Sequence, residues 1–270
     1  MELEPTGERV IEEHYQSSEQ AYLIYLFHVA TYNFCKQYIA GKKVLDYGCG
    51  SGYGTASISN DCASIAGIDI APDAIAYAKE HYQAANLSYQ TIAKADDAPL
   101  PFPDASFDIV LSFQVIEHIE DVQAYLQEIK RVLTPDGLVI IATPDRSGRL
   151  LPFQKPWNMW HIKEYSGTTL HKTLATQFAA VDIQYMGGKE AVIRLELDRT
   201  RKLMWTTLPV TLPIVPEIIR ISCLRFLKFL KQQLSPESTT PFIPSFDVSA
   251  LSISANEQNS VNLISLAKNA

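Results

Sequence analysis

The sequence predicts an α/β protein built on a mostly parallel sheet with helices on both faces. Three observations support this prediction. Short apolar runs alternate with helical stretches over residues 44–142, the connections between them are short, and a glycine-rich turn follows the first run. Parallel neighbouring strands need crossover connections, which place helices on both faces of a sheet. The 270 residues, 47% hydrophobic and 20% charged, suit one globular domain with or without an elaboration.

The first half of the chain carries the regular alternation. Residues 8–38 are predicted as a helix that ends before Gly41, with Tyr22 and Leu26 on its apolar side. Pro72 is expected in the first turn of its helix, where its missing N–H leaves no hydrogen bond unmade. A turn is expected at 135–137, after a helix that ends in two basic residues. The expected strands are 44–47, 64–69, 87–92, 107–113 and 137–142, and the expected helices are 52–59, 72–84 and 121–133.

After Thr143 the alternation loosens. A stretch rich in Trp and Pro, PFQKPWNMWHIKEYS, leads into the second part, and SPESTTPFIPS has the composition of a linker. The elements expected there are a helix near 167–178, a strand near 181–186, a helical region at 200–235, and strand-like runs at 248–254 and 261–268.

Composition and charge exclude several classes of protein. No run of about 18 uncharged apolar residues is present, so no membrane-spanning helix is predicted. The N-terminal MELEPTGERV is polar and acidic, unlike a secretory signal. Four cysteines stand singly, which favours a reducing, cytoplasmic setting. The net charge of −7 argues against binding to a nucleic-acid backbone.

The glycine-rich turn VLDYGCGSGYG points to a nucleotide-like cofactor, and its details indicate which kind. A dinucleotide fingerprint needs glycines at relative positions one, three and six. From Gly48 the sixth position is Tyr53, and from Gly50 it is Thr55, so the fingerprint fails in both registers. Asp46, just before the turn, would also repel a pyrophosphate. A cofactor that carries positive charge in place of phosphates, such as S-adenosylmethionine, suits this turn.

Two further acids follow the next two predicted strands. Asp69 lies 23 residues after Asp46, where a carboxylate can accept hydrogen bonds from both ribose hydroxyls. Asp96 follows the third strand, where it can meet the adenine amino group. Each acid taken alone can be explained as a helix or turn cap. Three acids at three successive strand ends around a glycine turn favour a cofactor site.

The same stretches resemble a known family. VLDYGCGSGYG, GIDIAPDAIAYAKEHY, ADDAPLPFPDASFDIVLSFQVIEHIED and RVLTPDGLVIIATP resemble, in order and spacing over residues 42–145, the motifs of class I S-adenosylmethionine-dependent methyltransferases. The resemblance implies a Rossmann-like doubly wound sheet, and VNLISLAKN looks like its last, antiparallel strand. It also implies S-adenosylmethionine as the cofactor and methyl transfer as the activity.

The resemblance assigns roles to individual residues. It implies that the methionine end is held by Asp46, Gly48 and Gly50, and the ribose by Asp69. The N-terminal segment resembles that of methyltransferases in glycan or natural-product pathways, where it helps to cover the cofactor. This resemblance implies that Tyr32 contacts the cofactor. The remaining implied contacts are Ile70 on the adenine, Asp96 and Asp97 at the adenine edge, and Phe113 and Gln114 near the methyl group and acceptor.

The same likeness suggests how the chain is divided. Residues 1–40 are expected as an N-terminal helical cover and 41–187 as the cofactor-binding core. WNMWHIKEYS resembles the His-x-x-Glu-Tyr segment of this group. Residues 188–256 are then an insertion that acts as an acceptor lid, and 257–270 supply the final strand.

Two histidines are the candidate catalytic residues, because a hydroxyl acceptor needs a general base. His118 is expected near the cofactor end of the sheet, and His161 in the aromatic loop that returns to the same mouth; both also have a purely structural interpretation. Small-RNA 2′-O-methyltransferases resemble this stretch in a Glu-x-x-Glu-His motif, with a later His, that binds a metal. Glu117, His118 and His161 match it, but Gln114 replaces the first carboxylate, so no metal is predicted.

Residues 216–231 are a basic, amphipathic stretch. Seven Lys or Arg and one acid lie between Arg199 and Lys231. Peripheral membrane contact and a lid over a lipid-like or phosphorylated acceptor are the functional interpretations, and a packing helix with a solvated basic face is the alternative. The sequence indicates nothing about oligomeric state.

The sequence thus favours methyl transfer to oxygen or nitrogen of a small-molecule acceptor, with a sugar, glycan or natural-product intermediate preferred from the resemblance. A quinone-like or lipid acceptor at a membrane surface is the alternative. A non-catalytic S-adenosylmethionine-binding or membrane-associated protein is the rival from another class, and a dinucleotide oxidoreductase is disfavoured by the glycine spacing.

Overall fold

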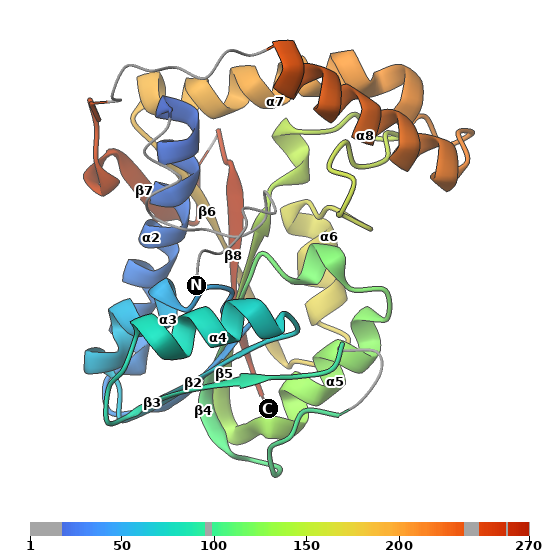
Figure 1. Cartoon of the computed structure of the whole chain (residues 1–270). Coiled ribbons are helices and arrows are strands. Elements are labelled where there is room, and N and C mark those ends of the chain that lie inside the picture. The colour runs from blue at the N-terminus through green and yellow to red at the C-terminus, as the bar shows by residue number, and fades with distance from the viewer. Residues whose placement is uncertain (1–17, 95–98, 235–242, 258, 270) are drawn as a thin grey trace.

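The computed structural model describes residues 18–94, 99–257 and 259–269, except for 235–242. Eight strands in the described residues form one sheet in the order β3-β2-β1-β4-β5-β8-β6-β7 (Figure 1). Strands β1 to β5 are parallel neighbours, whereas β8 is antiparallel to both β5 and β6, and β7 is antiparallel to β6. The strands are β1 Lys43–Tyr47, β2 Ser64–Asp69, β3 Leu87–Thr91, β4 Phe107–Phe113, β5 Leu133–Pro144, β6 Ala180–Gly188, β7 Leu251–Ser254 and β8 Asn262–Lys268.

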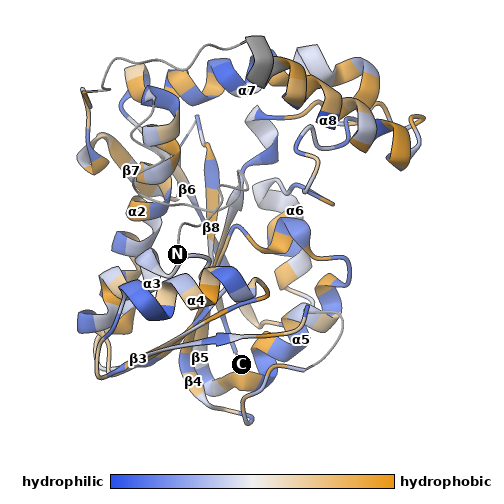
Figure 2. Cartoon of the chain, viewed as in Figure 1, coloured by the Kyte–Doolittle hydropathy of each residue, from blue (hydrophilic) through white to orange (hydrophobic). Residues whose placement is uncertain are grey.

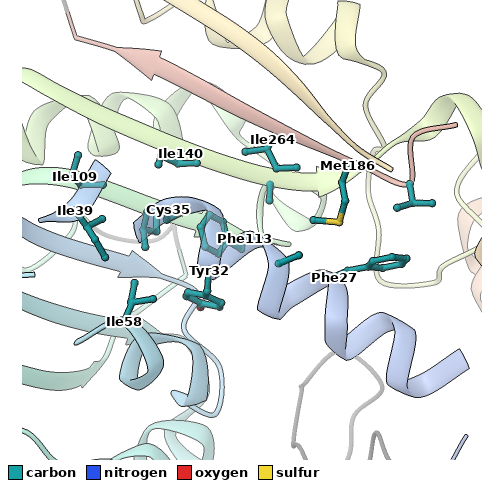
Figure 3. Close-up of a cluster of buried hydrophobic side chains, with 14 of the residues drawn as sticks. Phe27, Tyr32, Cys35, Ile39, Ile58, Ile109, Phe113, Ile140, Met186 and Ile264 are labelled. Carbon is teal, nitrogen blue, oxygen red and sulfur yellow. The ribbon is translucent and has the colours of Figure 1, made fainter. Parts of the chain in front are cut away.

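Helices cover both faces of the sheet. One face packs against α2 (Glu19–Ile39), α3 (Tyr53–Ile58) and α4 (Pro72–His81), and the other against α5 (Val122–Val132) and α6 (Gly167–Leu174). Because side chains alternate along a strand, Val44 and Asp46 face α2 while Leu45 and Tyr47 face α5. Figure 3 shows the first core, where Phe27, Tyr32, Cys35 and Ile39 meet Ile109, Phe113, Ile140 and Ile264. The predicted doubly wound α/β fold, with an antiparallel last strand, is confirmed.

The predicted elements of the first half are confirmed with small changes at their ends. Helix α2 begins after Ser18, whose hydroxyl accepts a hydrogen bond from the Ala21 N–H at 3.1 Å; the predicted start at residue 8 lies outside the described residues. Strand β5 begins at Leu133, before the predicted turn. The pairing jumps from Leu133 to Leu138, so the turn residues 134–137 form an irregularity inside the strand. Short 3-10 turns lie at Ser59–Asp61, Ile116–His118, Arg146–Gly148 and Val248–Ala250.

The second half departs further from the prediction. Helix α7 (Glu190–Thr211) begins ten residues before the predicted helical region and continues through Pro209, and α8 (Glu217–Leu234) follows after a short turn. Pro209 lacks the N–H that would bond the carbonyl four residues earlier, but it lies in the last turn of α7, so only the end of the helix is disturbed. Strand β7 comes from the segment predicted as an insertion and extends the sheet beyond β6.

Helices α7 and α8 lie across one end of the sheet (Figure 1). The loop after β5 holds them there: the Gln154 side chain donates to the Met204 carbonyl at 2.9 Å, and the Lys155 N–H donates to the Thr211 carbonyl at 2.9 Å. Arg220 of α8 is buried and donates to the Pro156 carbonyl at 2.5 Å. Within the described residues, the helices fall short of the length and apolarity that a bilayer crossing requires.

Candidate functional site

The glycine turn after β1 places backbone where side chains cannot fit. Gly48 has a φ of +87°, and a Cβ there would lie 2.3 Å from Cγ2 of Val115. The Gly48 and Cys49 N–H groups both donate to the Ile68 carbonyl, at 2.8 and 3.0 Å, which ties the turn to the end of β2. The turn therefore presents bare backbone at the carboxyl ends of β1 and β2, where ligands bind in open α/β sheets.

Asp46 lies behind the turn and is 1% exposed. Its Oδ2 accepts hydrogen bonds from the Tyr32 hydroxyl at 2.9 Å and the Thr55 hydroxyl at 2.6 Å. Its Oδ1 has no hydrogen-bond partner among the described residues. Burial raises the pKa of this carboxyl to about 6, against the opposing effect of the two hydroxyls. A buried carboxylate with an unsatisfied oxygen suits a cationic ligand group.

Asp69 ends β2 and orders two loops. Its Oδ2 accepts from the Gly50 N–H and its Oδ1 from the Ala71 N–H, both at 2.9 Å. The carboxylate thus stands between the glycine turn and the start of α4. Its neighbour Ile70 is 53% exposed and lines the same cavity, which leaves it available to a flat ligand.

The glycine turn, Asp69 and Ile70 line a cavity of about 480 Å³ at the carboxyl ends of β1, β2 and β4, whereas Asp46 lies behind the turn and is not one of its lining residues. The predicted residues that line it are Tyr32, Gly48, Gly50, Asp69, Ile70, Phe113, Gln114 and His118. Gln114 has a φ of +57°, a left-handed conformation that is uncommon outside glycine, at the point where the chain leaves β4. Asp96 and Asp97, the predicted adenine contacts, lie outside the described residues. A larger cavity of about 710 Å³, bordered by Asp145 and Arg201, lies apart from this site and shares none of its lining residues.

Comparisons with known proteins agree with this geometry. A family model described as a methyltransferase domain matches residues 45–141. A protein of Mycolicibacterium smegmatis named "Probable S-adenosylmethionine-dependent methyltransferase" is 33% identical over 149 residues, covering 55% of this chain and 56% of that protein. Residues 45–141 form a methyltransferase domain, and the likeness to an S-adenosylmethionine-dependent methyltransferase extends over 149 residues.

Two further matches place this methyltransferase domain among its relatives. A ubiquinone biosynthesis O-methyltransferase of Glaesserella parasuis is 35% identical over 113 residues, covering 40% of this chain and 48% of that protein. A Thermotoga maritima structure titled as a SAM-dependent methyltransferase, possible histamine N-methyltransferase, has a TM-score of 0.56 at 13% identity, over 90% of this chain and 89% of that one. The chain spans about half the length of the curated relatives it matches.

S-adenosylmethionine is the cofactor of this domain family, and the residues present fit it. The orphaned Oδ1 of Asp46 suits a positive charge, the Asp69 carboxylate lines the cavity, and a Cβ at Gly48 would disturb the turn. The fit rests on the described residues alone. The contacts that the resemblance assigns to individual residues remain predictions.

The fold brings the two candidate catalytic histidines together. The rings of His118 and His161 lie 4.9 Å apart at 85°. His118 lines the cavity, and its Nδ1 lies 3.0 Å from the Trp160 carbonyl. His161 is 4% exposed, outside the cavity lining, and its Nδ1 lies 2.8 Å from Oε1 of Glu164. His118 follows β4 and His161 belongs to the loop after β5, and this loop folds back so that the two rings meet.

Sequence reasoning missed several residues of the site. His28 lines the cavity one helical turn before Tyr32, and burial lowers its pKa to about 4, so its imidazole is neutral at pH 7. Its i, i+4 spacing from Tyr32 was a usable signal. Tyr53, Lys94 and Trp160 also line the cavity, and their placement depends on packing between distant segments.

Proposed function

We propose that this chain transfers a methyl group from S-adenosylmethionine to an oxygen or nitrogen of a small-molecule acceptor, with a sugar, glycan or natural-product intermediate preferred. The observation that carries the proposal is the continuous cavity that joins the glycine turn to Phe113, Gln114 and His118. It gives one space in which a cofactor and a small acceptor can meet. The preference among acceptors rests on the family resemblance.

When bound, the cofactor supplies an electrophilic methyl group whose bond to sulfur breaks with its electron pair remaining on sulfur. The chain's residues contribute alignment, which can lower a barrier by about 7–11 kcal/mol. Asp46, behind the glycine turn, and Asp69, in the cavity lining, would orient the cofactor, and the buried rings of Tyr32 and Phe113 form an apolar wall beside it.

A hydroxyl acceptor must also lose its proton. His118 Nδ1 faces a carbonyl, which can only accept a hydrogen bond, so the neutral ring carries its proton on Nδ1 and its lone pair on Nε2. Nε2 of His118 is therefore the proposed proton acceptor, an effect of about 10²–10⁴-fold. His161 is the second candidate, oriented by Glu164.

The cofactor half of the proposal is tested by isothermal titration with S-adenosylhomocysteine, alongside NAD. We expect micromolar binding of S-adenosylhomocysteine alone, lost in Asp69→Ala and retained in the matched control Asp136→Ala, an exposed acid between α5 and the body of β5. Binding of NAD, or unchanged binding in Asp69→Ala, contradicts the proposal. Acceptor screening with labelled methyl donor then separates an enzyme from a protein that binds without turnover.

A lipid or quinone-like acceptor at a membrane surface is the second candidate. Hydrophobic residues run along α8 (Figure 2), and many of them are exposed: Ile218 82%, Phe226 60%, Phe229 54% and Leu227 41%. Arg225 and Lys228 are exposed beside them. The relative from Glaesserella parasuis acts, by its name, in ubiquinone biosynthesis. Arg220 does not belong to the basic face, because it is buried against Glu217 and Pro156.

Vesicle co-sedimentation tests this second candidate. We expect the protein to bind vesicles with about 30% anionic lipid at low salt, and Phe226→Ser with Phe229→Ser to abolish binding. The control Lys79→Ser, on exposed α4, should bind like the wild type. Absence of vesicle binding by the wild-type protein contradicts the membrane version and leaves the small-molecule version standing.

A further inference from the structure

Beside the cavity, three side chains with metal-ligating atoms converge. Glu117, His118 and His161 each offer one ligand atom, and these atoms all lie within 4.8 Å of one another. Glu117 and His118 belong to the short turn after β4, and His161 to the loop after β5. Two backbone bonds hold the loop in place: the Ile162 and Lys163 N–H groups donate to the Glu117 carbonyl at 2.8 and 3.3 Å.

We propose that Glu117, His118 and His161 form a binding site for one divalent transition-metal ion at the acceptor end of the cavity. This revises the expectation of a metal-free site, which rested on the replacement of a carboxylate by Gln114. Two imidazoles and one carboxylate are sufficient protein ligands for a catalytic metal that keeps coordination positions open. Gln114 need not be a ligand at all.

The carboxylate is the first independent observation. Glu117 is fully buried, its Oε2 accepts from the Thr143 hydroxyl at 2.9 Å, and its Oε1 has no hydrogen-bond partner among the described residues. A buried carboxylate oxygen without a partner is destabilising. The Tyr165 hydroxyl, also fully buried, likewise has no partner among the described residues. A cation between Glu117 and the two imidazoles would satisfy the carboxylate.

The outer hydrogen bonds of the imidazoles are the second observation. His118 Nδ1 faces the Trp160 carbonyl at 3.0 Å, and His161 Nδ1 faces the Glu164 carboxylate at 2.8 Å. Both partners accept, so each neutral ring carries its proton on Nδ1 and its lone pair on Nε2. Metal-bound histidines typically donate their other N–H to a carbonyl or carboxylate in this way.

A charged network keeps the His161 partner in position. Arg149 is buried and donates to Glu164 at 3.1 Å, and its guanidinium also lies 3.5 Å from Glu196. It lies 4.4 Å above the Trp157 ring. Glu164 therefore faces both a guanidinium and an imidazole, and these two contacts hold its orientation.

The donor set indicates the class of ion and its use. Imidazole nitrogen suits Zn²⁺, Fe²⁺ or Ni²⁺ better than Ca²⁺ and Mg²⁺, which prefer oxygen, and Mn²⁺ accepts the carboxylate oxygen of such a mixed set. Because His118 lines the cavity, an ion held by the three side chains would lie at the cavity wall. It would polarise an acceptor hydroxyl, and His118 and His161 would then be metal ligands in place of the general-base roles given to them above. This role, unlike the binding site itself, rests on the proposed methyl transfer.

The test is a titration of chelator-treated full-length protein with Mn²⁺ and with Zn²⁺, followed by calorimetry and, for Mn²⁺, by electron paramagnetic resonance. We expect one ion per chain. Glu117→Gln, His118→Gln and His161→Gln should each weaken binding by at least tenfold. The control His171→Gln, an exposed histidine of α6, should bind like the wild type. Glu117→Gln keeps the size of the side chain and an oxygen for Thr143, so folding is expected to survive.

Each outcome decides the proposal. Saturable binding that is weakened in the three variants and retained in His171→Gln supports it. No saturable binding by wild-type protein, or binding that the three variants leave unchanged, overturns it. S-adenosylhomocysteine is titrated on the same preparations: retained cofactor binding without metal binding removes only the metal site, whereas metal binding without cofactor binding removes the proposed function and leaves the metal site standing.

Discussion

The two halves of this chain differ in where the partners of their polar side chains lie along the sequence. From β1 to β5, the polar contacts of the cofactor site join neighbouring strand ends, as when Asp69 accepts from Gly50 and Ala71. After β5, partners come from far along the chain: Arg149 meets Glu196, and Gln154 meets Met204. The first half is therefore recognisable from consecutive residues, and the second depends on long-range contacts.

The largest expected effect comes from breaking the network of the second half. Arg149→Met leaves the buried carboxylates of Glu164 and Glu196 without their shared cation, so we expect a loss of about 3–5 kcal/mol in the free energy of unfolding. Urea denaturation measures it. Arg194→Met is the control, because that 69% exposed side chain forms only a surface pair with Glu190 and should change stability by less than about 1 kcal/mol. A similar small change in Arg149→Met would contradict the difference between the halves.

Asp46→Asn should separate stability from cofactor binding. Burial raises the pKa of this carboxyl from 3.8 to about 6, so keeping it ionised at pH 7 costs the folded protein about 3 kcal/mol. That cost is the upper limit of the free energy of unfolding that Asp46→Asn can gain. We expect a higher melting temperature of the ligand-free protein together with at least 100-fold weaker binding of S-adenosylhomocysteine. Differential scanning calorimetry and titration measure the two effects. A lower melting temperature would mean that the carboxylate is a net stabiliser.

The same pKa predicts how cofactor affinity depends on pH. The folded pKa lies above the unfolded value, so the folded protein binds the extra proton between about pH 4 and 6, and this contribution to stability is lost as pH rises through 6. The positive ammonium group of S-adenosylhomocysteine needs the ionised form of the carboxyl. Affinity for S-adenosylhomocysteine should be constant above about pH 7 and about tenfold weaker at pH 5. In Asp46→Asn this dependence should vanish; its persistence there would assign the titration to another group.

Tyr32→Phe should have the smallest effect of the four. It removes one of two hydroxyl donors to Asp46 and leaves Thr55 in place, so we expect a loss of about 1 kcal/mol in stability and a few-fold change in cofactor affinity. Urea denaturation and titration measure these quantities. Tyr38→Phe, a partly buried tyrosine on the same helix, is the control and should change neither. A loss of cofactor affinity as large as that in Asp46→Asn would mean that Tyr32 itself holds the cofactor.

The three proposed metal ligands lie at the boundary between the two halves. Glu117 and His118 follow β4 and belong to the recognisable first half, whereas His161 arrives with the loop after β5. Spacing alone could not reveal that their ligand atoms lie within 4.8 Å, nor that Glu117 is buried with an unsatisfied oxygen. The prediction of a metal-free site rested on residue types, and the proposed metal site rests in addition on the distances between them.

Local sequence patterns predict the sheet of the first half, the glycine turn and the acids at the ends of β1 and β2. Alternation of apolar residues and the chemistry of glycine are local properties, so consecutive residues suffice to predict them. Only the tertiary structure decided that α7 continues through Pro209, that Arg220 is buried, that β7 joins the sheet and that His28 lines the cavity. Those outcomes depend on which distant segments pack together, because burial and hydrogen bonding outweigh local preference wherever the two compete.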